Sequence, residues 1–235
     1  MSLWTKAISS SLVRQVEGLW WLWNTSRSIA NHIVFFRQHK EYTTLLVVYV
    51  EGIISTGNNE GEIALLKVQL GKEFEVKDLG FLQYFLGIEV ARGVEGVVLS
   101  QQKYVLDLLI ETGMLGFRLV APPIDQGIKL TELAGEKVDC ERYQRLVGRL
   151  IYLTHTRLDI SFAVIVVSRY MHDPRKDHMD AMYHILRYLK GAPGKVLIFR
   201  NMVILKLRAI VILIGLVVLM IGNPHQDTAC LLGAI

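Results

Sequence analysis

Two apolar runs separated by a polar step occupy residues 45–56, LLVVYVEGIIST. Runs of this length that are rich in β-branched residues are typical of strands. The pair Glu51-Gly52 lies between them, and a two-residue turn of this kind predicts a β-hairpin. A Gly-Asn-Asn turn at residues 57–59 ends the second predicted strand.

Shorter segments between residues 77 and 99 also predict β structure. Residues 77–80 combine polar residues with glycine and predict a turn. Residues 84–90 predict a strand, and residues 93–96 predict the turn that leads into a further strand at residues 97–99. The sequence therefore predicts a second hairpin.

Apolar residues three and four positions apart predict helices in the rest of the chain. The predicted helices are residues 60–74, 101–112, 141–154, 159–171 and 177–190. Gly113 follows the second of them, which is a common helix stop. Residues 120–139 contain Pro122-Pro123 and no long apolar run, so they predict a linker before a helical second half.

Composition bounds the class of protein only loosely. The 235 residues are 51% hydrophobic and carry a net charge of +4, with an isoelectric point near 9.0 and a mean hydropathy of +0.34. This charge is compatible with nucleic-acid binding but too mild to argue for it alone. Cys140 and Cys230 imply no disulfide framework and fit a reducing compartment. Residues 1–26 lack the apolar core of a secretory signal.

Four histidines lie between residues 155 and 184, namely His155, His172, His178 and His184, which raises the possibility of a metal site. His178 and His184 are six residues apart, so they do not share one helical face at ligand spacing. We therefore expect surface or capping histidines and no metal site among them.

Several short sequence motifs occur in an order that is specific to one protein family. They are residues 73–80, 84–90, 99–101, 143–148, 150–153, 159–164 and 186–191. Through them, residues 29–199 resemble the reverse transcriptase domain of Pol polyproteins from copia-type (Pseudoviridae-like) retrotransposons. The resemblance is to a truncated and degenerate copy, because the fingers and the upstream palm strand with the first catalytic aspartate have no counterpart.

The resemblance implies an α+β fold. A partial polymerase palm, an antiparallel sheet with helices, would span residues 29–119. A linker at residues 120–140 would lead to a thumb-like helical part at residues 141–199. Residues 1–28 are expected to lie outside the family, and residues 200–235 to form an apolar tail.

The family's catalytic turn reads Tyr-Val-Asp-Asp, and its counterpart here is Tyr49-Val50-Glu51-Gly52. Polymerases hold two divalent metals against the attacking and leaving oxygens, and Mg²⁺ requires oxygen ligands at about 2.0–2.1 Å. Glu51 places its carboxylate on a longer side chain, and Gly52 has no ligand. We therefore predict that both positions are non-functional, that Mg²⁺ binds poorly and that polymerisation is lost. Alternatively, the pair is simply a favourable hairpin turn.

The resemblance further implies a nucleic-acid partner, the primer–template duplex of a retrotransposon whose life cycle includes DNA integration. Tyr84, Phe85, Leu86 and Gly87 correspond to the family's primer grip, where a strand–turn–strand holds the primer end. The alternative is an ordinary hairpin with a buried aromatic pair.

Three basic residues of the predicted helices, Arg145, Arg149 and Lys190, could contact phosphates and position a duplex. They could equally be solvated charges on helix surfaces. Any binding of nucleic acid is thus expected to be weak, and no small-molecule substrate follows from the sequence. By family resemblance the location is cytoplasmic or nuclear.

The apolar tail allows two interpretations. Residues 203–222 suggest a membrane span and hence a small anchored protein, but Lys206 and Arg208 interrupt them, and the remaining apolar run is shorter than the roughly 20 residues a span needs. A frame-shift explains the tail better. With a permitted choice of codons, residues 201–235 re-read in another frame resemble the start of a ribonuclease H domain. Membrane contact is therefore not expected.

Overall fold

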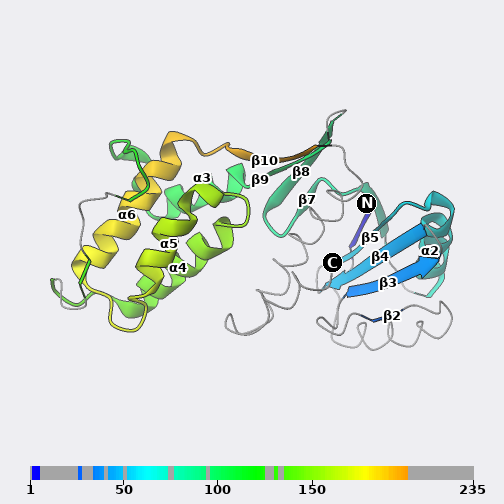
Figure 1. Ribbon diagram of the computed structural model, residues 1–235, viewed down its shortest axis with the longest axis horizontal. Helices are drawn as coiled ribbons and strands as arrows, with labels where there is room; N and C mark the ends of the chain where they lie inside the picture. Colours follow the sequence, from blue (N-terminus) through cyan, green and yellow to red (C-terminus); the bar gives the residue numbers. More distant parts are fainter. Residues whose placement is uncertain are drawn as a thin grey trace. The chain divides into compact units, whose positions relative to one another are not determined.

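The computed structural model describes residues 2–5, 26–27, 34–39, 42–49, 52–73, 77–93, 96–124, 130–131 and 135–200. The chain forms two compact units, and the boundary lies between Gln83 and Tyr84. Figure 1 draws the first unit from blue to cyan and the second from green to orange. The second hairpin thus lies in the same unit as the helices. The end of the palm at residue 119 stays a prediction.

The described part of the first unit is an antiparallel sheet with a helix beside it. The strands are β1 (Ser2–Thr5), β2 (Ser26–Arg27), β3 (Val34–His39), β4 (Tyr42–Tyr49), β5 (Gly52–Gly57) and β6 (Lys77–Phe81), in the order β2-β3-β4-β5-β1-β6. Helix α2 (Glu60–Glu73) confirms the first predicted helix. Its Glu62 accepts a hydrogen bond from Thr44 Oγ1 at 2.6 Å and pairs with Arg37 at 2.9 Å, which fastens the helix to β3 and β4.

The β4–β5 hairpin forms where the sequence predicted it, but Gly52 belongs to a strand. Val48 and Ile53 are fully buried and opposite each other. Continuing this register pairs Tyr49 with Gly52, so Gly52 is the first residue of β5 and not part of the turn. The prediction that Gly52 belongs to the turn is wrong, because the buried cross-strand pairs set the register. Glu51 lies outside the described residues.

Four of the six described strands of this sheet, β1, β2, β3 and β6, were not predicted. Strand β1 lies between β5 and β6 and pairs with both, although residues 1–28 were set apart in the sequence. Strand β6 replaces the turn predicted at residues 77–80. The turn signal has a local cause, since Asp78 Oδ1 accepts the Gly80 amide at 2.8 Å and Gly80 has a φ of 77°. These residues therefore form an irregular edge strand of the sheet, and not the predicted turn.

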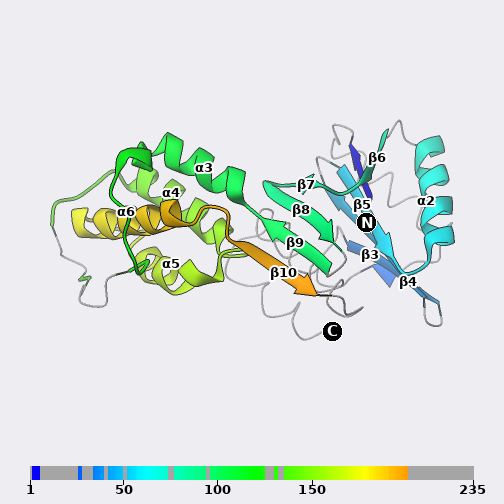
Figure 2. The same ribbon diagram turned by 90° about the horizontal axis from the view of Figure 1, so that it is seen from above.

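A four-stranded antiparallel sheet opens the second unit (Figure 2). Its strands are β7 (Tyr84–Phe85), β8 (Ile88–Gly93), β9 (Gly96–Ser100) and β10 (Val196–Arg200), in the order β10-β9-β8-β7. The predicted turn between β8 and β9 is confirmed by the pairing of Gly93 with Gly96. Strand β10 was not predicted, and it pairs with β9 along its whole length.

The single strand predicted at residues 84–90 is broken in two. Leu86 and Gly87 have φ values of 49° and 79°, and they connect the paired residues Phe85 and Ile88. Two consecutive positive φ values are typical of a type I′ hairpin turn, whose twist matches that of the flanking strands. The sequence did not reveal this turn because leucine seldom adopts a positive φ.

The helical predictions of the second unit are largely confirmed. The helices are α3 (Gln102–Glu111), α4 (Cys140–Leu153), α5 (Ser161–Ser168) and α6 (Lys176–Gly191), drawn green to yellow in Figure 1. Helix α5 is shorter than predicted, because a 3₁₀ turn (Leu158–Ile160) replaces its start. Their apolar faces form one core, whose fully buried members include Leu108, Tyr143, Leu150, Ile160, Ile185 and Leu189.

None of the helices in the described ranges is both long and apolar enough to cross a membrane. The apolar tail, with the membrane segment at residues 203–222 and the frame-shift hypothesis, lies outside the described residues.

Candidate nucleic-acid interface

The β4–β5 hairpin carries the predicted catalytic positions. Gly52 is buried and paired with Tyr49, so it contributes only backbone at the end of the hairpin. Within the described ranges, no three His, Cys, Asp or Glu side chains are grouped to hold a metal ion. Metal pairs in polymerases require carboxylate oxygens. The described part of this hairpin therefore does not fit a two-metal site.

The β7–β8 turn carries the predicted grip. Tyr84 is 47% exposed and Phe85 is 4% exposed, because successive residues of a strand face opposite sides. The alternative of a buried aromatic pair is therefore wrong for Tyr84. Leu86 and Gly87 form the turn itself, and β8 follows from Ile88, so Tyr84 to Gly87 make up the first strand and the turn of a strand–turn–strand.

Two tyrosines from the helices hold this turn. The hydroxyl of Tyr152, on α4, donates a hydrogen bond to the Leu86 carbonyl. Gly87 lies against Tyr104 of α3, and a Cβ at residue 87 would be 3.3 Å from Tyr104 Cδ2. The centroids of the Tyr104 and Tyr152 rings are 5.3 Å apart, with an interplanar angle of 58°. Backbone conformation and aromatic packing together fix the turn.

Arg149 reaches the same place from α4. Its guanidinium lies 5.4 Å from the Tyr104 ring centroid, within cation–π range, and pairs with Glu111. The Tyr104 hydroxyl donates to the Arg149 carbonyl at 3.5 Å. Burial lowers the pKa of Arg149, but hydrogen bonds with Glu111 and Tyr104 outweigh it and raise the pKa. Arg149 therefore keeps its positive charge, which the carboxylate of Glu111 partly offsets.

Arg145 and Lys190 differ in their relation to the turn. Arg145 is exposed and lies four residues before Arg149, so the two share a face of α4. Lys190 donates through Nζ to the Phe117 carbonyl at 2.8 Å, which ties α6 to the segment after α3. The contacts therefore join the turn to Arg149, and helical spacing adds Arg145. None of the described contacts brings Lys190 to the turn.

Sequence reasoning did not identify the two tyrosines as site residues. Tyr152 and Leu86 are 66 residues apart, and no local pattern reports such a contact. One signal was present, since Arg145, Arg149 and Tyr152 follow one another at intervals of four and three, which places them on one helical face.

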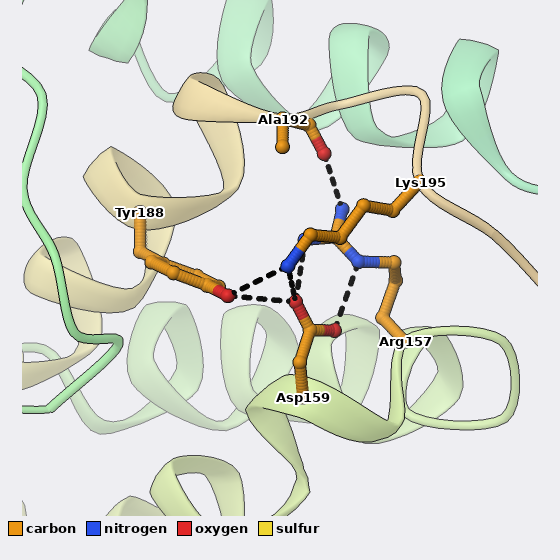
Figure 3. Close-up of polar contacts among 5 residues, drawn as sticks. All are labelled: Arg157, Asp159, Tyr188, Ala192 and Lys195. Atoms are coloured by element: carbon orange, nitrogen blue, oxygen red, sulfur yellow. Dashed lines mark hydrogen bonds and ion pairs between the residues drawn. The ribbon is translucent and has the colours of Figure 1, made fainter.

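A second polar cluster lies at the C-terminal end of α6 (Figure 3). Arg157 is 2% exposed and donates to both carboxylate oxygens of Asp159 at 3.0 Å and to the Ala192 carbonyl at 2.8 Å. Tyr188 and Lys195 each donate to Asp159 Oδ2 at 2.9 Å. Burial raises the pKa of Asp159, but the hydrogen bonds from Arg157, Lys195 and Tyr188 outweigh it and hold the pKa far below its usual value. The cluster joins the start of α5 to α6 and β10.

His178 and His184 form hydrogen bonds with the backbone. His178 is fully buried, so the capping role is confirmed for it and the surface role is wrong. Its Nδ1 accepts the Arg175 amide at 3.0 Å, its Nε2 bonds the Thr131 carbonyl at 2.9 Å, and its ring stacks on Tyr170 at 3.8 Å. His184 bonds the Pro122 carbonyl at 3.0 Å. The two rings therefore bind different backbone segments.

Residues 4–126 match the family described as reverse transcriptase (RNA-dependent DNA polymerase). The chain belongs to the reverse transcriptase family. The match covers both hairpins and begins within the N-terminal segment that the sequence analysis set apart. The α+β fold with antiparallel sheets is consistent with a partial reverse transcriptase domain.

Relatives place this reverse transcriptase segment among Pol polyproteins. It is 42% identical over 167 residues to the retrovirus-related Pol polyprotein from transposon RE2 of Arabidopsis thaliana, covering 71% of this chain and 12% of that protein. The polyprotein from transposon RE1 of the same plant is 40% identical over 168 residues, again 71% of this chain and 12% of that protein. Both transposons are copia-type, so the resemblance found in the sequence is confirmed.

An uncharacterised mitochondrial protein of Arabidopsis thaliana is 37% identical over 146 residues, which cover 62% of this chain and 61% of that protein. The chain thus spans about an eighth of the two polyproteins' length (12%) and under two thirds of this smaller relative. No solved structure matches the chain.

Proposed function

We propose that this chain is a reverse transcriptase segment that does not catalyse DNA synthesis. One observation carries the proposal: Gly52, buried and paired in β5, occupies a position where the family pattern has a carboxylate. Two-metal catalysis depends on carboxylate oxygens that keep the metal ions in place. A residue with only backbone removes one such ligand, and Glu51 offers the other on a longer side chain.

Primer extension on a homopolymer template, with Mg²⁺ or Mn²⁺, tests this proposal. The unmodified chain is expected to give no product. A variant with Glu51→Asp and Gly52→Asp, and one with Glu51→Asp alone, form the matched series. Product from the double variant only would assign the loss to these two positions. Product from the unmodified chain would overturn the proposal.

A second function, nucleic-acid binding without catalysis, is supported by the second unit. The exposed ring of Tyr84 precedes a rigidly held turn, and α4 presents Arg145 and Arg149 on the face that holds this turn. Aromatic rings stack on bases of any sequence, and arginines bind phosphates. This combination favours weak binding of a primer–template duplex without sequence preference.

Titration of a labelled primer–template at several salt concentrations tests this second function. The affinity is expected to fall as salt rises, because bound cations release counterions from the phosphates. Arg145→Ala is expected to reduce the slope of log K against log salt by about 0.9, the value for one phosphate contact. Arg169→Ala, the same charge change at the exposed end of α5, is the control. Absence of binding by the unmodified chain at low salt would reject this function.

A further inference from the structure

We propose that Tyr152, supported by Tyr104, is a positioning residue for nucleic-acid binding. It fixes the β7–β8 turn to α4, so that the turn and the arginines of α4 meet a duplex as one surface. This inference rests on the nucleic-acid-binding function proposed above and adds the residue that keeps its two elements in register.

The β7–β8 hairpin needs an anchor because its own pairing is weak. Among the described residues, strand β7 has two residues, lies at the edge of its sheet and forms the pairs Tyr84↔Glu89 and Phe85↔Ile88. Leu86 adopts a φ of 49°, which costs free energy in a non-glycine residue. A short edge strand with a strained turn persists only when surrounding groups hold it.

Tyr152 supplies this support at the tip of the hairpin. Its hydroxyl donates to the carbonyl of the strained residue Leu86, and the side chain is 8% exposed. The neighbouring Gly87 lies beside the Tyr104 ring, since a Cβ at this position would be only 3.3 Å from Tyr104 Cδ2. The turn therefore cannot slide along α4 without losing the hydrogen bond and the contact between Gly87 and the ring.

The same helix face carries the arginines. Tyr152 is three residues after Arg149 and seven after Arg145, and the Arg149 guanidinium lies over Tyr104, the ring that contacts Gly87. The Tyr152 hydroxyl and the Tyr104 ring thus hold the turn beside Arg149. Releasing the turn should leave every cation in place and change only the distance between Tyr84 and the phosphate contacts.

Tyr152→Phe removes the hydroxyl and keeps the ring. Tyr170→Phe is the matched control, because the Tyr170 hydroxyl also donates to a distant carbonyl, that of Leu130 at 2.9 Å, away from the turn. Hydrogen exchange of the free chain is expected to become faster at residues 85–88 in Tyr152→Phe but not in Tyr170→Phe. Binding of the primer–template is expected to weaken roughly fivefold, the effect of losing one ordinary hydrogen bond. The salt slope is expected to stay unchanged because no cation is lost.

Each result has a distinct meaning. Equal exchange rates at residues 85–88 in both variants would show that Tyr152 does not anchor the turn. Faster exchange at residues 85–88 with binding no weaker than that of Tyr170→Phe would overturn the positioning role. A reduced salt slope would also overturn it, because it would mean that Tyr152 acts through Arg149. Absence of binding by the unmodified chain would reject the proposed function and this role with it. The exchange measurement needs no nucleic acid, so it still separates that failure from failure of the anchor.

Discussion

The two hairpins of this chain differ in what their turns contribute. At β4–β5 the family's contribution is a pair of carboxylates, and here Gly52 joins the strand ladder without any side chain. At β7–β8 the contribution is a backbone shape, since Leu86 and Gly87 both have positive φ and two tyrosines hold them.

This difference teaches that the groups needed for metal chemistry and those needed for folding are different residues. Neighbouring carboxylates repel each other when no metal is bound, so replacing one by glycine costs the fold little. A turn defined by its backbone has no such freedom. Chemistry can therefore be lost at the first hairpin while the second keeps its geometry.

The largest expected effect concerns the buried ion pair of the second unit. Arg157→Met should lower the free energy of unfolding by about 3 kcal/mol, because Asp159 and the Ala192 carbonyl lose buried donors. Urea unfolding followed by helical circular dichroism measures it. Lys195→Met removes an exposed partner of the same carboxylate and should cost less than about 1 kcal/mol. Equal losses would mean that burial does not decide the stability of the unit that carries the second turn.

Gly87→Ala tests whether the β7–β8 turn depends on its backbone conformation. It should cost about 1–2 kcal/mol, because a Cβ is strained at a φ of 79° and meets the Tyr104 ring. Gly148→Ala on α4 is the control, since nothing lies within 4 Å of the new Cβ, and it should stabilise the helix by up to about 1 kcal/mol. Thermal unfolding should show shifts of opposite sign. An unchanged thermal midpoint in Gly87→Ala would show that the β7–β8 turn does not depend on its backbone conformation.

Acid should weaken the second unit through Asp159. The folded state lowers the pKa of this carboxyl below the value of about 3.9 expected in the unfolded chain. The ionised form therefore stabilises the fold above about pH 4, and this contribution is lost as the pH falls through the folded pKa. Urea midpoints measured from neutral to acidic pH should fall, and Asp159→Asn should flatten the fall. An identical decline in both proteins would assign it to other carboxyls.

The smallest effect is expected at Leu158. Leu158 is 65% exposed and begins the 3₁₀ turn, a position that suits the fixed φ of proline. Leu158→Pro should stabilise the chain by about 0.4–1 kcal/mol, mainly by restricting the unfolded state. A rise in the thermal midpoint with unchanged nucleic-acid binding would support this. A fall would show that residue 158 needs a conformation that proline cannot adopt.

Local patterns predicted the helices better than the strands. Val105, Leu146 and Ile185 lie on the predicted buried faces of α3, α4 and α6, because a helix is built from contacts three and four residues apart. Strand pairing joins distant residues. The predicted turn at residues 77–80 is therefore strand β6, and the predicted strand at residues 84–90 is interrupted by a turn.

The family, the positions of the helices and the absence of a carboxylate at Gly52 follow from the amino-acid sequence alone. The bond from Tyr152 to Leu86 and the bond from Arg157 to Ala192 depend on how the chain folds. These bonds join residues 66 and 35 positions apart, as the bond to Leu86 and the bond to Ala192 show. Periodicity reports which side of an element is buried, but not which distant group its polar atoms meet.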